Sequence, residues 1–146
     1  MRTILILCLS ILFLPLTLAA EGLTVTGGEE NTDYSYADNV YTVLTGTALT
    51  FSGTTTTDRI VIKERVTADI ILDNVDIQFT TIDQWGDGKA VFHINKNASA
   101  TITLANTNIL TSNGKSSGLE VPEGTSVIIQ GDGQLTATGG TSSGEA

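Results

Sequence analysis

The sequence predicts an all-β protein, a right-handed single-stranded parallel β-helix (a solenoid) of about four rungs, on two observations. First, one unit is written three times between Asp58 and Gly140, and each copy holds two short runs that alternate apolar and polar residues. Alternation with a period of two places every second side chain on one face of a strand. Second, no stretch after the N-terminal leader has helical periodicity, so the crossover helices of an ordinary parallel sheet are missing and a stack of rungs is expected.

The spacing of apolar residues is the same in all three copies, and a weaker copy precedes them. Ile62 and Ile70 are eight residues apart, as are the corresponding pairs of the next two copies. Chance pairing of short strands would not preserve this spacing. The residues expected to face inward are Tyr41, Val43, Leu49, Phe51, Ile60, Ile62, Ile70, Leu72, Val75, Ile77, Phe79, Phe92, Ile94, Ala100, Ile102, Leu104, Ile109, Leu119, Val121, Val127, Ile129, Leu135 and Ala137.

Asn, Asp and Gly recur after the second run of each copy, at Asp73–Asn74, at Asn106 and at Gly131–Asp132. These residues tolerate left-handed backbone and hydrogen-bond their own turns, which suits the stacked corners of a solenoid. The alternative is that they form unrelated hairpin turns of a β-sandwich.

Residues 1–20 have the order of a signal peptide: a cationic start with Arg2, the apolar run Ile4–Leu18 and the small pair Ala19–Ala20. This predicts a secreted or cell-surface protein. The only cysteine, Cys8, lies in this leader, so the mature chain is expected to have no disulfide. Loss of the Arg2 charge changes the formal net charge from −9 to −10, which disfavours nucleic acid and anionic membranes as partners, and no membrane insertion is expected once the leader is removed.

The expected rungs occupy residues 40–140 and are flanked by two polar segments. Residues 21–39 are expected to form a short strand, Leu23–Thr26, and a loop that caps the first rung. Residues 141–146 are of low complexity and hold no strand that would cover the last rung. We therefore expect either a truncated solenoid or a partner on that rung, with self-association of two copies as one form of it.

Thr80–Lys89 lengthens the second rung and carries the only tryptophan, Trp85, between Asp83 and Asp87. An aromatic face beside carboxylates suits sugar recognition, because the apolar face of a pyranose stacks on the ring while its hydroxyls bond to polar neighbours. The sequence therefore predicts a carbohydrate-binding loop made by Trp85, Asp83 and Asp87. The alternative is that Trp85 folds back and seals the coil.

Calcium is the candidate cofactor, because it takes six to eight oxygen ligands. Asp73, Asp76 and Asp83 are the candidate metal ligands, with Asn74 and Asp87 close to them in the same corner. The spacing of these residues does not match an EF-hand or the glycine-rich calcium repeat.

Two further residues have weaker patterns. Asn97–Ala98–Ser99 fits the acceptor pattern for N-glycosylation, which applies only if the host secretes through a glycosylating pathway. His93 is the only histidine and is expected to face outward, with no cysteine nearby, so no catalytic or metal role is assigned to it.

The phrase Gly118–Thr125, continued by Gly131–Gly140, resembles a recurring phrase of a family of secreted carbohydrate-binding-domain proteins, and so does Arg59–Ile62 leading into Ala68–Ile77. The resemblance covers about Val40–Gly140. It implies a right-handed parallel β-helix at a cell surface, with cellulose or acidic plant polysaccharides as ligands and calcium as a bound metal. Members run on through further rungs, which this sequence does not contain.

These observations favour a secreted or cell-surface, non-catalytic module that binds a polysaccharide or cell-surface glycan, with calcium as a candidate aid. The alternative is a structural, adhesin-like surface solenoid with a protein partner. A polysaccharide lyase or hydrolase is the least favoured reading, because Arg59 and Arg65 face no acidic cluster in the expected register and no catalytic phrase is present.

Overall fold

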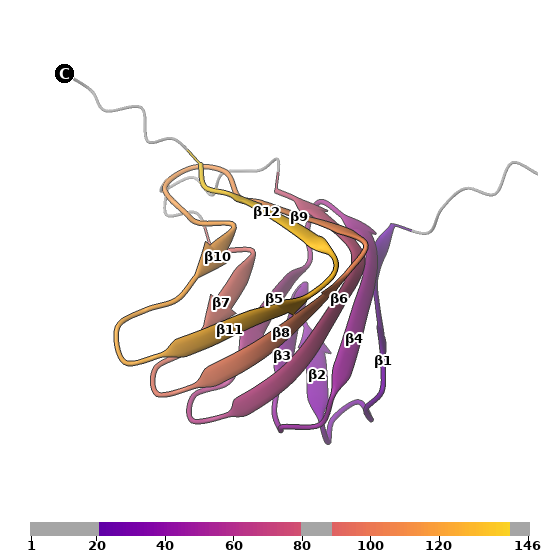
Figure 1. Ribbon diagram of the computed structural model, residues 1–146, viewed down its shortest axis with the longest axis vertical. Helices are drawn as coiled ribbons and strands as arrows, with labels where there is room; N and C mark the ends of the chain where they lie inside the picture. The colour runs from indigo at the N-terminus through magenta and orange to yellow at the C-terminus, as the bar shows by residue number, and fades with distance from the viewer. Residues whose placement is uncertain (1–20, 80–88, 141–146) are drawn as a thin grey trace, which may run out of the picture.

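The computed structural model describes residues 21–79 and 89–140, which form twelve strands in two sheets (Figure 1). The seven-stranded sheet contains β1 (Gly22–Thr26), β4 (Leu49–Thr55), β6 (Thr67–Gln78), β8 (Ser99–Ala105), β9 (Thr107–Thr111), β11 (Ser126–Gly131) and β12 (Gln134–Thr138). The five-stranded sheet contains β2 (Tyr34–Ala37), β3 (Val40–Val43), β5 (Arg59–Ile62), β7 (Phe92–Ile94) and β10 (Leu119–Glu120). In these two ranges of the chain there is no helix long and apolar enough to cross a membrane.

The repeated unit of the sequence appears as tiers, each of which gives one strand to the five-stranded sheet and then one or two strands to the seven-stranded sheet. The four tiers are β3–β4, β5–β6, β7–β8–β9 and β10–β11–β12, and they follow one another across Figure 1 from purple to yellow. Successive tiers pair in parallel in both sheets. Equivalent residues of the repeat are hydrogen-bonding neighbours, as with Ile70, Ile102 and Ile129.

The prediction of a single-stranded right-handed parallel β-helix is wrong, because both sheets are mixed. β1 pairs antiparallel with β4, and β2 pairs antiparallel with β3. Between β2 and β3 the chain reverses at Asp38 and Asn39, which have positive φ angles of 51° and 60°. Two consecutive residues of this conformation make the tight turn that joins antiparallel strands, and Asp and Asn tolerate it. Local turn chemistry therefore sets the strand direction at this end.

The repeated Asn and Gly residues do not form the hairpin turns of a β-sandwich either. Asn74, Asn106 and Gly131 have positive φ angles of 55°, 56° and 96°, and each lies where its tier bends within the seven-stranded sheet. The Asn106 side chain donates to Asp73 Oδ1 of the preceding tier at 2.7 Å. The tiers joined in this way pair in parallel, which hairpins do not produce.

The core lies between the two sheets and contains nearly all the residues expected in the first three tiers. Ile109 is an exception, because it is only half-buried while its neighbours Asn108 and Leu110 are fully buried. The pairing of β9 with β6 is shifted by one residue relative to the pairing of β8 with β6. Since side chains alternate with a period of two, a shift of one residue exchanges the inward and outward faces.

The fourth tier is far more exposed than the other three. Val121 and Ile129, which were expected to face inward, are 41% and 46% exposed, and Ala137 is exposed as well. Ile128 is 61% exposed. These residues lie on the last strands of the stack or directly beside them, and no described strand pairs with the outer edge of these strands. The expectation of burial was therefore wrong for this tier because it assumed a neighbour on both sides.

Candidate functional site

The residues predicted to bind carbohydrate, Trp85, Asp83 and Asp87, lie outside the described residues. The role of this loop therefore remains a prediction.

The described residues of the predicted metal site, Asp73 and Asp76, already have side-chain partners. Asp73 Oδ1 accepts from the Asn74 and Asn106 amides at 3.0 and 2.7 Å. Both carboxylate oxygens of Asp76 accept from the Gln78 amide, at 2.9 and 3.1 Å. The third candidate ligand, Asp83, lies outside the described residues, and within residues 21–79 and 89–140 no group of three or more His, Cys, Asp or Glu side chains is placed to hold a metal.

Asn97 is exposed at the turn between β7 and β8, with a positive φ of 60°. The acceptor asparagine of the predicted glycosylation pattern is thus on the surface.

A pocket that the sequence did not indicate lies at the closed end of the stack, where β1 and the β2–β3 turn meet the turn between β4 and β5. We call it the Tyr36 pocket; its volume is about 370 Å³. It is lined by Glu21, Gly22, Leu23, Tyr36, Asn39, Tyr41, Thr55, Thr56, Thr57 and Asp58.

Asp58 forms the base of the Tyr36 pocket and is only 4% exposed. Its Oδ1 accepts a hydrogen bond from the Tyr36 hydroxyl at 2.9 Å, and its Oδ2 accepts one from the Leu23 backbone N–H at 3.2 Å. The backbone N–H of Asp58 donates to Thr55 Oγ1 at 3.1 Å. These three bonds fix the carboxylate between strands that are far apart in the sequence.

Tyr36 forms one wall of the pocket, and 41% of the residue is exposed. Its ring stacks on the Tyr41 ring with centroids 4.3 Å apart, and Tyr41 meets Phe51 of the core edge to face at 5.8 Å. The Tyr41 hydroxyl donates to the Leu23 carbonyl at 2.8 Å. The Tyr36 ring is therefore held in place from one side and by its hydroxyl.

Both phenols at the pocket stay protonated at neutral pH. The hydrogen bond to Asp58, with burial as the second cause, raises the pKa of Tyr36. Burial, followed by the charge of Asp58, raises the pKa of Tyr41 to about 12. Each hydroxyl thus acts as a hydrogen-bond donor to its acceptor in the protein.

The signals for this pocket were weak in the sequence. Tyr36 lies in the segment expected to be a loop, and the threonines of residues 54–57 look like an ordinary turn or edge. In the structure Thr55 is buried, and Thr56 and Thr57 line the pocket. The pocket exists because three separate segments converge, which no local pattern reveals.

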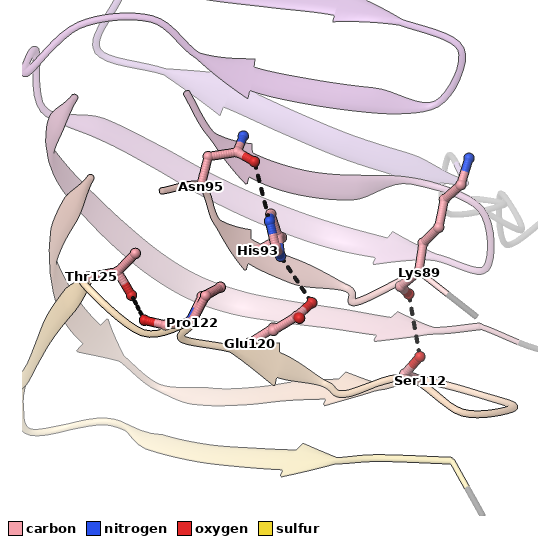
Figure 2. Close-up of polar contacts among 7 residues, drawn as sticks. All are labelled: Lys89, His93, Asn95, Ser112, Glu120, Pro122 and Thr125. Atoms are coloured by element: carbon pink, nitrogen blue, oxygen red, sulfur yellow. Dashed lines mark hydrogen bonds and ion pairs between the residues drawn. The ribbon is translucent and has the colours of Figure 1, made fainter. Parts of the chain in front are cut away.

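A second polar cluster lies on the five-stranded sheet and joins the last two tiers (Figure 2). His93 Nδ1 lies 2.9 Å from Glu120 Oε2, and its Nε2 lies 3.2 Å from Asn95 Oδ1. Arg59 is on the neighbouring strand β5; burial lowers its pKa, against the charge of Glu120, and its Nε has no hydrogen-bond partner among the described residues. Since β10 is only two residues long, the contact between His93 and Glu120 reinforces a short strand pairing.

Comparison of the chain with protein-family models, with curated proteins and with solved structures found no match. The resemblance to secreted carbohydrate-binding-domain proteins gains no support from these comparisons and remains a prediction.

Proposed function

We propose that this protein is a secreted or cell-surface, non-catalytic carbohydrate-binding module whose ligand binds in the Tyr36 pocket. The observation that supports the proposal is the exposed Tyr36 ring beside polar side chains in one concave site. The apolar face of a sugar would stack on the ring, and its hydroxyls would bond to Asn39, Thr56 and Thr57.

The pocket is preorganised for such a ligand. Its volume of about 370 Å³ falls in the lower part of the range for small-molecule sites, which is about 300–1,000 Å³. Tyr36 is fixed by its stacking on Tyr41 and by its bond to Asp58, so little side-chain freedom is lost when a ligand arrives.

Binding is favoured over hydrolysis because of how Asp58 is engaged. A glycosidase uses two carboxyl groups that flank the scissile bond, one of which gives or takes a proton. Both oxygens of Asp58 instead accept hydrogen bonds from the protein, which suits a group that positions other side chains.

The test is calorimetric titration of the purified protein with soluble neutral and acidic oligosaccharides, with and without calcium. Tyr36→Ala is expected to weaken binding about tenfold, since loss of the stacking surface removes about 1.4 kcal/mol. Trp85→Ala is the matched aromatic variant for the loop predicted from the sequence. Binding with unchanged affinity in a folded Tyr36→Ala protein, or binding of no oligosaccharide in the set, would overturn the proposal.

A structural or adhesive role is the second candidate, and a different observation favours it. Val121, Ile128 and Ile129 are exposed together on the last tier, on the strands β10 and β11 or directly beside them. A strand edge that exposes aliphatic side chains is a site at which another strand can add. In this role a protein partner or a second copy would cover the fourth tier.

A further inference from the structure

Asp58 is a buried carboxylate that has no positively charged side-chain partner among the described residues. Its two hydrogen-bond donors, the Tyr36 hydroxyl and the Leu23 N–H, are neutral. In residues 21–79 and 89–140, Arg65 forms an ion pair with Glu64 and His93 contacts Glu120, and neither pair includes Asp58. Burying a carboxylate is costly unless a cation or several donors compensate it. The pocket thus lacks a positive charge at its base.

The remaining charge of the pocket has the same sign. Glu21 is the other charged residue that lines it, and no basic residue of the described chain does. The basic residues lie instead on strands of the five-stranded sheet or in the turns next to them: Arg59, Lys63, Arg65, Lys89, Lys96 and Lys115. The side chains of the pocket therefore favour a cationic sugar over an anionic one.

The aromatic wall adds a second attraction of the same kind. The face of a tyrosine ring carries partial negative charge and binds an ammonium group placed over it. Tyr36 presents an exposed ring next to the Asp58 carboxylate. The Asp58 carboxylate lies at the hydroxyl edge of the Tyr36 ring, so an ammonium group bound near this edge interacts favourably with the carboxylate charge and with the aromatic ring.

We propose that the Tyr36 pocket selects amino sugars with a free ammonium group, such as the units of a glucosamine oligomer. This inference rests on the proposed function and names the ligand class of that same site. The ammonium group donates to Asp58 and lies against the Tyr36 ring, and the neighbouring sugar hydroxyls bond to Asn39 and Thr57. Each oxygen of Asp58 accepts one bond from the protein, and a carboxylate oxygen has the capacity to accept a second.

The experiment compares two oligomers of equal length, one of glucosamine and one of N-acetylglucosamine, which share the sugar ring and differ in the ammonium charge. Calorimetry of the purified protein is done at mildly acidic pH, where the free amine is protonated. We expect the glucosamine oligomer to bind about tenfold tighter, and we expect added salt to reduce this preference.

Asp58→Asn is expected to abolish the preference, because the amide keeps one acceptor oxygen and removes the charge. Asp76→Asn is the matched control, since it removes one negative charge from the chain at a carboxylate that bonds to Gln78 outside the pocket. If Asp58→Asn does not fold, Tyr36→Phe replaces it: this variant keeps the ring and the carboxylate and is expected to keep the preference.

The outcomes separate the two proposals. Equal affinity for both oligomers, with loss of binding in Tyr36→Ala, would leave the proposed function standing and overturn this inference. A preference for the free amine that persists in folded Asp58→Asn, or that disappears in Tyr36→Phe, would also overturn it. Calcium that binds through Asp58 and is needed for the N-acetylated oligomer to bind would show that a metal takes the place of the ammonium group, and it would overturn this inference. Binding of neither oligomer, nor of any other sugar, would overturn both.

Discussion

Asn108 is a polar residue in the middle of an apolar core, and it links three tiers. It is fully buried on β9, at the position where the preceding tier has Val75. Its Oδ1 accepts from the Val75 backbone N–H at 3.0 Å, and its Nδ2 donates to the Ala105 and Gln134 carbonyls at 3.0 and 3.3 Å. One side chain therefore hydrogen-bonds backbone groups of three successive tiers next to the bend in the sheet.

Asn108→Ala is expected to lower the free energy of unfolding by about 2–4 kcal/mol, because it leaves the buried Val75 N–H and two carbonyls without this partner. Asn108→Asp should destabilise the fold as well, since it keeps the acceptor but loses the donor and buries a charge. Urea unfolding followed by circular dichroism measures both. The exposed neighbour Thr107 is the control, and Thr107→Ala should stay within about 0.5 kcal/mol of the wild type. An Asn108→Ala protein as stable as this control would contradict the prediction.

Ionisation of the Tyr41 hydroxyl at alkaline pH is expected to lower the stability of the fold. Its pKa is raised to about 12, first by burial and then by the charge of Asp58, whereas an unfolded tyrosine titrates near 10. A raised folded-state pKa gives stability that is fully present below about pH 10 and is lost as the pH rises through about 12. Tyrosinate absorbance and denaturant unfolding across this window measure the effect. Tyr41→Phe should remove the corresponding step, and a step that persists in this variant would assign the effect to another group.

At the scale of elements, the two ends of the stack differ in whether their edge strands are covered. The first tier is covered on its outer edge by β1 and β2, which pair with β4 and β3. At the other end β11 and β12 contain no charged residue and no proline, so they lack the usual features that prevent edge strands from pairing with other chains.

Ile128→Lys tests whether the fourth tier is an association surface. We expect the wild type to associate reversibly as its concentration rises, and we expect Ile128→Lys to shift it toward monomer in sedimentation equilibrium. The change in unfolding free energy should be about 0.5 kcal/mol or less, because Ile128 is 61% exposed. Thr24→Lys adds the same charge to the exposed strand β1 at the opposite end and should leave association unchanged. A wild type that remains monomeric at all concentrations would rule out the second candidate function in its self-associating form.

The repeat predicted the parallel pairing between tiers, because equal spacing of apolar residues forces equal register. It did not predict the antiparallel strands, because β2 reverses through the local turn at Asp38 and Asn39 and shares no pattern with the repeat. The repeat also did not predict which residues of β9 face inward. Ile109 and Leu110 are adjacent and both apolar, so alternation alone does not choose between them, and the choice depends on one residue at the preceding bend.

At the scale of the whole molecule, the sequence was least informative about the candidate site. Composition drew attention to Trp85, because a single tryptophan beside carboxylates is visible in a short window. The Tyr36 pocket depends on contacts between residues far apart in the chain, such as Leu23 and Asp58, and on a tyrosine in a segment without apolar alternation. Local sequence patterns predict strands. A pocket made by three converging segments can be identified only once the fold is known.

The order of the tiers gives the folding of this protein a direction. The antiparallel pairs of the closed end, β1 with β4 and β2 with β3, lie within Gly22–Thr55, and the bonds of Asp58 to Leu23 and Tyr36 follow a few residues later in the chain. Every later tier then meets a finished edge that already has the correct spacing and register. Each addition pairs residues one tier apart in the chain, such as Ile70 with Ile102, so the entropic cost of loop closure is spread over successive steps. The tiers are thus expected to fold one after another from the N-terminal strands to the C-terminal strands, in the order in which the chain is synthesised.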